Sequence, residues 1–196
     1  MAGSVFCARD GAIATITLAN PGKLNAVDFA MCESLATTVG TLSADNEIRC
    51  LILRGDGDQA FAAGGDIEEF LTQRDTVDRA MTYHGQVGAT LQAVADCRHP
   101  TIALIQGACI GGGLEIAAQC DLRICGESSR FGAPINKLGF SMYPGEMAGL
   151  LRLAGATTVL ELLLEGRILS AAEAYAKGLV TRVVADKDVE IGRAHV

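Results

Sequence analysis

The chain has 196 residues, of which 49% are hydrophobic and 20% are charged, and its net charge at pH 7 is −7. This length suits one domain with an ample core, and this composition excludes a largely disordered chain. The negative charge argues against general binding to nucleic acid or to an anionic membrane, although a local basic pocket for one polyanionic ligand remains open.

Cysteine and histidine usage gives no sign of a disulfide framework or a metal site. The seven cysteines are scattered and never spaced as Cys-x-x-Cys, so we interpret them as reduced, mostly buried thiols. The three histidines lie far apart, and no metal ligand set is expected. The sequence has no secretory signal pattern and no run of about 18 apolar residues. We therefore expect a cytoplasmic protein without a membrane partner.

The N-terminal part predicts a hairpin followed by a helix. Residues 5–7 and 13–18 are rich in β-branched side chains and flank Asp10-Gly11, a dipeptide that favours a tight turn. Residues 29–42 then place apolar side chains at helical spacing, and Asp28 is the predicted N-cap.

A second predicted strand, residues 48–53, leads to the first of two glycine turns. Phe61-Ala62-Ala63-Gly64-Gly65-Asp66 presents small residues ahead of a short helix that begins near Ile67. Asp66 is the predicted cap of that helix.

A long helix is predicted from about residue 76 to residue 97, ended by Pro100. Its apolar stripe contains Val77, Met81, His84, Val87, Leu91 and Val94. We interpret His84 as a partly buried pocket or core residue rather than a catalytic base.

The second glycine turn follows a buried strand predicted over residues 101–105. Gly111-Gly112-Gly113 precedes a helix predicted over residues 114–119. A strand, a glycine turn and a helix N-terminus leave main-chain N–H groups free for a phosphate or a developing oxyanion. Glu115 is then either a surface acid favourable to the helix dipole or a general acid/base beside the anion site. Two turns of this kind could aim two N–H groups at one oxygen.

The remaining pattern predicts further strands and helices and then a polar tail. The predicted elements are a strand over 121–125, an extended piece over 130–132, a loop over 138–146, helices over 147–153, 156–164 and 171–177, and a strand over 179–184. Repeated strand-turn-helix units indicate an α/β domain over residues 1–185, and the absence of Gly-x-Gly-x-x-Gly after the first strand argues against a dinucleotide fold. Residues 186–196 show no packing pattern, and we expect a disordered or non-native end.

The two glycine turns, in this order, resemble those of the crotonase, or enoyl-CoA hydratase/isomerase, superfamily. The resemblance covers about residues 5–185 and rests on Pro21–Ala26, Phe61–Ile67, Gly107–Glu115, Cys120–Ile124, Phe131–Pro134, Gly166–Ala174 and Gly178–Val180. It implies a crotonase-like α/β spiral of ββα turns, assembled as a homotrimer or a dimer of trimers. It also implies an acyl-CoA substrate, so coenzyme A is part of the substrate and no separate cofactor is expected.

The resemblance also assigns residues by matched position. It implies that the amides of Gly65 and Gly112 form an oxyanion hole and that Glu115 transfers protons. The residues implied along the coenzyme A path are Lys23, Leu24, Ala63, Gly65 and Asp66. Addition or deprotonation beside a thioester carbonyl produces an enolate-like oxygen, which two preorganised N–H donors stabilise.

Two features depart from the family pattern. Family hydratases carry a second glutamate after the Phe-Gly-x-Pro turn, where this chain has Ile135, a side chain that cannot move protons. Glu146 is either its substitute or a solvated loop acid, and Tyr143 is a weaker candidate. Family members also continue into a C-terminal helical region, whereas this chain stops soon after Val184. Without that region, apolar surface near residues 150–184 is expected to be exposed.

The leading hypothesis is therefore an acyl-CoA-processing enzyme that hydrates or isomerises a 2- or 3-enoyl-CoA. Its catalytic residues would be Glu115, Gly65, Gly112 and Glu146. Two alternatives stay open, namely a non-catalytic CoA-binding or assembly protein on the same scaffold and a glycine-rich phosphate binder of another fold.

Overall fold

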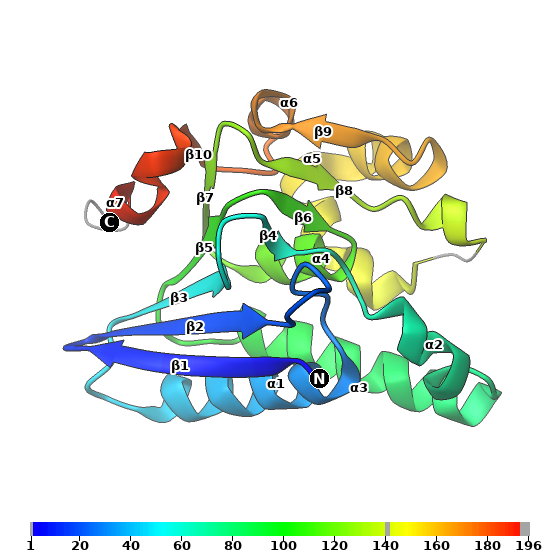
Figure 1. Cartoon of the computed structure of the whole chain (residues 1–196), viewed down its shortest axis with the longest axis horizontal. Helices are drawn as coiled ribbons and strands as arrows, with labels where there is room; N and C mark the ends of the chain where they lie inside the picture. Colours follow the sequence, from blue (N-terminus) through cyan, green and yellow to red (C-terminus); the bar gives the residue numbers. More distant parts are fainter. Residues whose placement is uncertain (1, 140–141, 193–196) are drawn as a thin grey trace.

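A computed structural model describes residues 2–139 and 142–192 and contains two β-sheets with helices packed around them (Figure 1). The larger sheet has the order β1 (Ser4–Asp10), β2 (Ile13–Ala19), β3 (Cys50–Gly55), β5 (Thr101–Ile105), β7 (Leu122–Gly126) and β10 (Arg182–Val184). The smaller sheet has the order β4 (Ala60–Ala62), β6 (Ala108–Ile110), β8 (Arg130–Gly132) and β9 (Ile168–Ser170). The helices are α1 (Phe29–Ala44), α2 (Ile67–Gln73), α3 (Val77–Ala95), α4 (Gly112–Gln119), α5 (Pro144–Leu164), α6 (Ala171–Ala176) and α7 (Val189–Gly192), with 3-10 turns at Ile135–Leu138 and Asp186–Asp188.

The chain repeats one unit, a strand in the larger sheet, a short strand in the smaller sheet, and then one or two helices. Strands β3, β5 and β7 pair in parallel in the larger sheet, and β4, β6 and β8 do so in the smaller one. This arrangement confirms the predicted α/β spiral of ββα turns. It brings the ends of β4 and β6, and the glycine turns that follow them, side by side.

Local sequence signals explain the N-terminal elements. Strands β1 and β2 form the predicted antiparallel hairpin around Gly11, which has a φ of 58°. Asp28 caps α1, and its Oδ1 accepts a hydrogen bond of 2.8 Å from the Met31 amide. Asp66 caps α2 in the same way through the Glu68 amide at 3.2 Å.

The predicted loop over residues 138–146 is wrong for its last three residues, which belong to a helix. Helix α5 begins at Pro144, and the fixed φ of proline suits the first helical position. Glu146 therefore lies in the first turn of a helix. Residues 140–141 of the predicted loop lie outside the described residues. The three-residue strands β4 and β9 were not predicted as strands, because so short a segment shows no alternation.

Helix α5 is, by length and composition alone, apolar enough to cross a membrane, with a mean hydropathy of 1.5. Gly155 has a φ of 72° and a ψ of 168° and interrupts the helical backbone. Each half is then shorter than the roughly 20 residues that span a bilayer. Leu150, Val159 and Leu162 belong to the protein core. We assign α5 to that core, and the absence of a membrane partner stays a prediction.

The predicted apolar stripe of α3 is only partly correct. Leu91 and Val94 are buried, whereas Val77 is 78% exposed and Met81 is 59% exposed. The first turns of α3 lie at the edge of the molecule beside α2, where the described chain places no layer over them (Figure 1). The spacing of a helix reveals which side chains share a face but not how far the covering layer extends.

The prediction of an unpacked tail is wrong for its first part. Residues 186–188 form a 3-10 turn and α7 follows it. The Val189 side chain is fully buried in a cluster with Ile52, Ile102 and Leu104 of the larger sheet. One apolar residue in a polar segment is too small a signal to predict such docking. Residues 193–196 lie outside the described residues.

The predicted exposure of apolar surface near residues 150–184 is confirmed. The exposed large apolar side chains in this part are Leu151, Leu160, Leu164, Ile168 and Tyr175.

Candidate active site

Each of the two glycine turns contains a glycine with a positive φ angle. Gly64 has a φ of 109° and Gly111 has a φ of 49°, conformations that favour glycine. Each is followed by the glycine predicted to donate its amide, Gly65 or Gly112. Both turns connect a strand of the smaller sheet to a helix.

The fold brings the two predicted donors together. A Cβ built on Gly112 would lie 3.5 Å from the Gly65 amide nitrogen. Helix α4 also packs directly against β4, because a Cβ on Gly113 would lie only 2.4 Å from the Ala62 carbonyl oxygen. A larger residue at 113 would separate the turns.

Both donor amides remain available for a ligand. The Val27 backbone pairs with the residues on either side of Gly65. Its carbonyl oxygen accepts a hydrogen bond of 3.0 Å from the Asp66 amide, and its amide donates one of 2.8 Å to the Gly64 carbonyl. Gly112 is the first residue of α4, where an amide has no acceptor within the helix. Within residues 2–139 and 142–192, neither amide donates a hydrogen bond.

A cavity of about 320 Å³ lies against these turns. Most of its lining is apolar, and its carboxylates are Glu115 and Glu146. Ile135 also lines it. The Ile135 side chain therefore presents only hydrocarbon to this space.

Glu115 is a cavity residue and not a surface acid. It projects from the first turn of α4, is only 6% exposed, and accepts no hydrogen bond from the described residues. Burial raises the pKa of its carboxyl to about 8, and the nearby negative charge of Glu146 contributes to this increase. These surroundings therefore favour the protonated form of the Glu115 carboxyl.

Glu146 is not a solvated loop acid either. Its side chain is 12% exposed, and His84 Nδ1 lies 3.0 Å from its Oε1. Its Oε2 accepts a hydrogen bond of 3.1 Å from the Tyr143 amide. The Tyr143 ring stacks on His84 and is absent from the described cavity lining, so the structure does not favour Tyr143 as the substitute acid.

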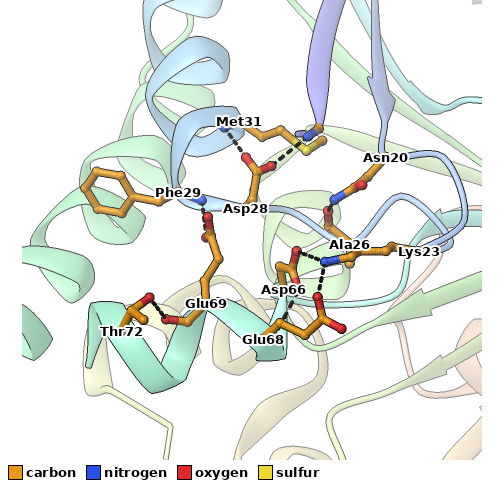
Figure 2. Close-up of polar contacts among 11 residues, drawn as sticks. Asn20, Lys23, Ala26, Asp28, Phe29, Met31, Asp66, Glu68, Glu69 and Thr72 are labelled. Atoms are coloured by element: carbon orange, nitrogen blue, oxygen red, sulfur yellow. Dashed lines mark hydrogen bonds and ion pairs between the residues drawn. The ribbon is translucent and has the colours of Figure 1, made fainter. Parts of the chain in front are cut away.

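The residues implied for the coenzyme A path lie around the first glycine turn. Lys23 Nζ lies 2.7 Å from Asp66 Oδ2 and 2.6 Å from Glu68 Oε2 (Figure 2). Hydrogen bonds to these two carboxylates raise the pKa of Lys23 above its usual value. Leu24 accepts a hydrogen bond of 3.0 Å from the Ala63 amide and is half-exposed. These contacts place residues 23–24 beside the turn.

The sequence did not reveal one polar contact at the cavity wall, between Arg74, which lines the cavity, and His84, which does not. Arg74, at the end of α2, places its guanidinium 3.0 Å from His84 Nε2 and over the Phe70 and Tyr83 rings. His84 is partly buried, as predicted, and it contacts Glu146 from outside the cavity lining. Residues ten positions apart on two helices meet here only because of how those helices pack, so no local motif points to them.

The fold and the site define an α/β protein of the ββα-spiral class, with two paired glycine turns over an apolar cavity that holds two carboxylates. The family model described as enoyl-CoA hydratase/isomerase matches residues 8–194. The chain belongs to the enoyl-CoA hydratase/isomerase family. This membership excludes the alternative of a phosphate binder of another fold.

The relatives that match this chain are longer than it is, so the chain covers only part of each of them. A probable enoyl-CoA hydratase of Mycobacterium bovis is 36% identical over 95% of this chain and 70% of its own length. The short-chain-enoyl-CoA hydratase of Clostridium acetobutylicum is 32% identical over 92% of this chain and 69% of its own. The crystal structure of an enoyl-CoA hydratase/carnithine racemase from Magnetospirillum magneticum is 45% identical with a TM-score of 0.95, covering 98% of this chain and 73% of that one.

Proposed function

We propose that this protein adds water to a 2-enoyl-CoA thioester. The observation that carries the proposal is a buried glutamic acid, Glu115, beside two unpaired glycine amides in an apolar cavity. The names of the relatives support the same class of reaction.

In this proposal the thioester oxygen accepts hydrogen bonds from the amides of Gly65 and Gly112. The two donors are fixed by the backbone, so they need no reorganisation when negative charge develops on that oxygen. The stabilisation is larger in the enolate-like state than in the ground state, which is the condition for faster turnover.

Glu146 and Glu115 then divide the proton transfers. Glu146 takes a proton from water as the water oxygen bonds to the β-carbon, and the electron pair of the double bond moves onto the thioester enolate. Glu115 gives its proton to the α-carbon and the enolate collapses to the 3-hydroxyacyl product. Release of the proton on Glu146 and uptake of one by Glu115 restore the pair.

The coenzyme A moiety runs past Lys23, Leu24, Ala63 and Asp66 in this proposal. Lys23 is the cation among them, and it would exchange part of its contact with Asp66 and Glu68 for a phosphate. Assembly as a homotrimer or a dimer of trimers remains a prediction, and light scattering after gel filtration measures it directly.

The test is the loss of the conjugated enoyl-thioester absorbance on addition of purified protein, followed over a series of acyl chain lengths. Hydration gives a 3-hydroxyacyl product with the mass of one added water. An isomerase would instead convert a 3-enoyl into a 2-enoyl thioester without adding water. A protein that does neither would contradict the proposal.

Ile135 supports one other function, a non-catalytic CoA-binding protein that kept the scaffold. Its side chain occupies the cavity wall where the family pattern has a carboxylate. This alternative predicts calorimetric binding of acyl-CoA with no turnover and no effect of Glu115→Ala on any reaction tested.

A further inference from the structure

We propose that His84 is a positioning residue that orients the Glu146 carboxylate, and that Arg74 selects the His84 tautomer able to do so. This inference rests on the proposed function of the cavity, because it assigns Glu146 a catalytic orientation. It concerns His84, which lies outside the cavity lining, and Arg74, which lines the cavity. Neither side chain is assigned a contact with the reacting atoms.

The tautomer of His84 follows from the hydrogen-bonding groups of Arg74 and Glu146 on either side of its ring. A guanidinium has only donors, and Arg74 Nη2 lies 3.0 Å from His84 Nε2. Nε2 must therefore accept, and the proton of the neutral ring lies on Nδ1. Nδ1 then donates to Glu146 Oε1 at 3.0 Å. A doubly protonated ring would point an N–H group at the Arg74 donors.

Packing holds the ring in this orientation. The Tyr143 ring lies 5.3 Å from the His84 ring at an interplanar angle of 23°, and Tyr83 contacts it edge-on at 6.0 Å. The His84 side chain is 16% exposed. A ring held between two aromatic side chains offers its Nδ1–H in a fixed direction, which a free surface histidine cannot do.

Two donors, His84 and the Tyr143 amide, hold the Glu146 carboxylate, whereas Glu115 accepts no hydrogen bond from the described residues. Oε1 faces His84, and Oε2 accepts from the Tyr143 amide. Hydrogen bonds donated to a carboxylate favour its charged form, the form that accepts a proton from water. The titratable and charged groups that surround the pair are Arg74, Tyr83, Glu115, Lys137 and Tyr143.

Steady-state kinetics with an enoyl-CoA substrate tests the inference. His84→Leu should lower kcat by about 10- to 100-fold with little change in KM, the loss expected from a misplaced reacting group. His84→Asn, whose amide can donate from near the Nδ1 position, should recover most of this loss.

Matched variants separate positioning from general damage. Arg74→Leu should lower kcat in the same direction, whereas Arg79→Leu, which removes an exposed arginine of α3 paired with Asp75, should leave it unchanged. His99→Gln removes a histidine that contacts the Asp45 carbonyl and does not line the cavity, so it should also leave kcat unchanged. Thermal unfolding of each variant shows whether the fold is retained.

Long-range proton–nitrogen NMR of the His84 ring gives a readout that needs no turnover. The wild-type ring should carry its proton on Nδ1, and Arg74→Leu should lose this preference. A wild-type ring protonated on Nε2 would overturn the inference. A wild-type enzyme that turns over at the same rate as His84→Leu would overturn it too, while leaving the hydratase proposal intact. Absence of wild-type turnover would contradict the hydratase proposal alone, and the NMR result would still decide the tautomer.

Discussion

Glu115 and Glu146 occupy equivalent places in two helices but have opposite surroundings. Each lies in the first turn of its helix, and each lines the same cavity. Glu115 is enclosed by apolar side chains with no donor in the described chain, and burial raises its pKa to about 8. Glu146 has donors at both oxygens. The comparison teaches that the surroundings, not the residue type or the helix position, raise the pKa of Glu115.

Removing the proton donor should have the largest effect. Glu115→Gln keeps the shape of the side chain but cannot release a proton, so we expect kcat for hydration to fall by roughly 10³-fold. Glu33→Gln changes an exposed acid on α1 and serves as the control. Stopped-flow absorbance gives both rates, and equal turnover of the two variants would remove Glu115 from the mechanism.

Altering the shared oxygen site should have the next largest effect. Gly112→Ala puts a methyl group 3.5 Å from the Gly65 amide, in the space that a thioester oxygen needs. We expect kcat to fall by about 10²-fold, comparable with the loss of one oxyanion donor. Gly40→Ala lies in α1 with open space around its Cβ and should not slow turnover. A fully active Gly112→Ala enzyme would argue against this site.

The stability of the fold should reveal the raised pKa of Glu115. Because the folded-state pKa of about 8 exceeds the ordinary value of 4.5, the folded protein holds the extra proton between these pH values. The stability linked to that proton is complete below pH 4.5 and is lost as pH rises through 8. Glu115→Gln has no such loss. The unfolding free energy of this variant minus that of the wild type should therefore increase from pH 5 to pH 8 by on the order of a few kcal/mol. Urea unfolding at both pH values measures it, and a constant difference would contradict the assigned environment.

The smallest expected effect concerns Lys23. Lys23→Ala removes a cation and leaves Asp66 and Glu68 to repel a phosphate, so KM for the CoA substrate should rise by about 2- to 5-fold with kcat unchanged. Added salt should reduce the difference. Lys187→Ala supplies a lysine control at the 3-10 turn of residues 186–188. An unchanged KM would show that the phosphates of the CoA substrate do not bind beside Lys23.

The sequence predicted the parts of this molecule that depend on local chemistry. Asp28 and Asp66 are helix caps, and a cap needs only a side-chain oxygen before the first turn. The glycine turns around Gly64 and Gly111 were also visible, because positive φ angles favour glycine.

The missed parts depend on distant segments. Contact between Arg74 and His84 requires two helices to pack in one way, and no spacing encodes it. Val189 docks on the larger sheet as a single apolar side chain. The start of helix α5 is the exception, because Pro144 at its first position is a local signal that the predicted loop over 138–146 does not use.

A crystal structure of the protein with acetyl-CoA bound tests the central claim most directly. The account expects the thioester oxygen to lie within hydrogen-bonding distance of both the Gly65 and Gly112 amide nitrogens, with the Glu115 carboxyl facing the neighbouring carbon. A thioester oxygen that contacts neither amide, or a Glu115 side chain turned away from that carbon, would contradict it.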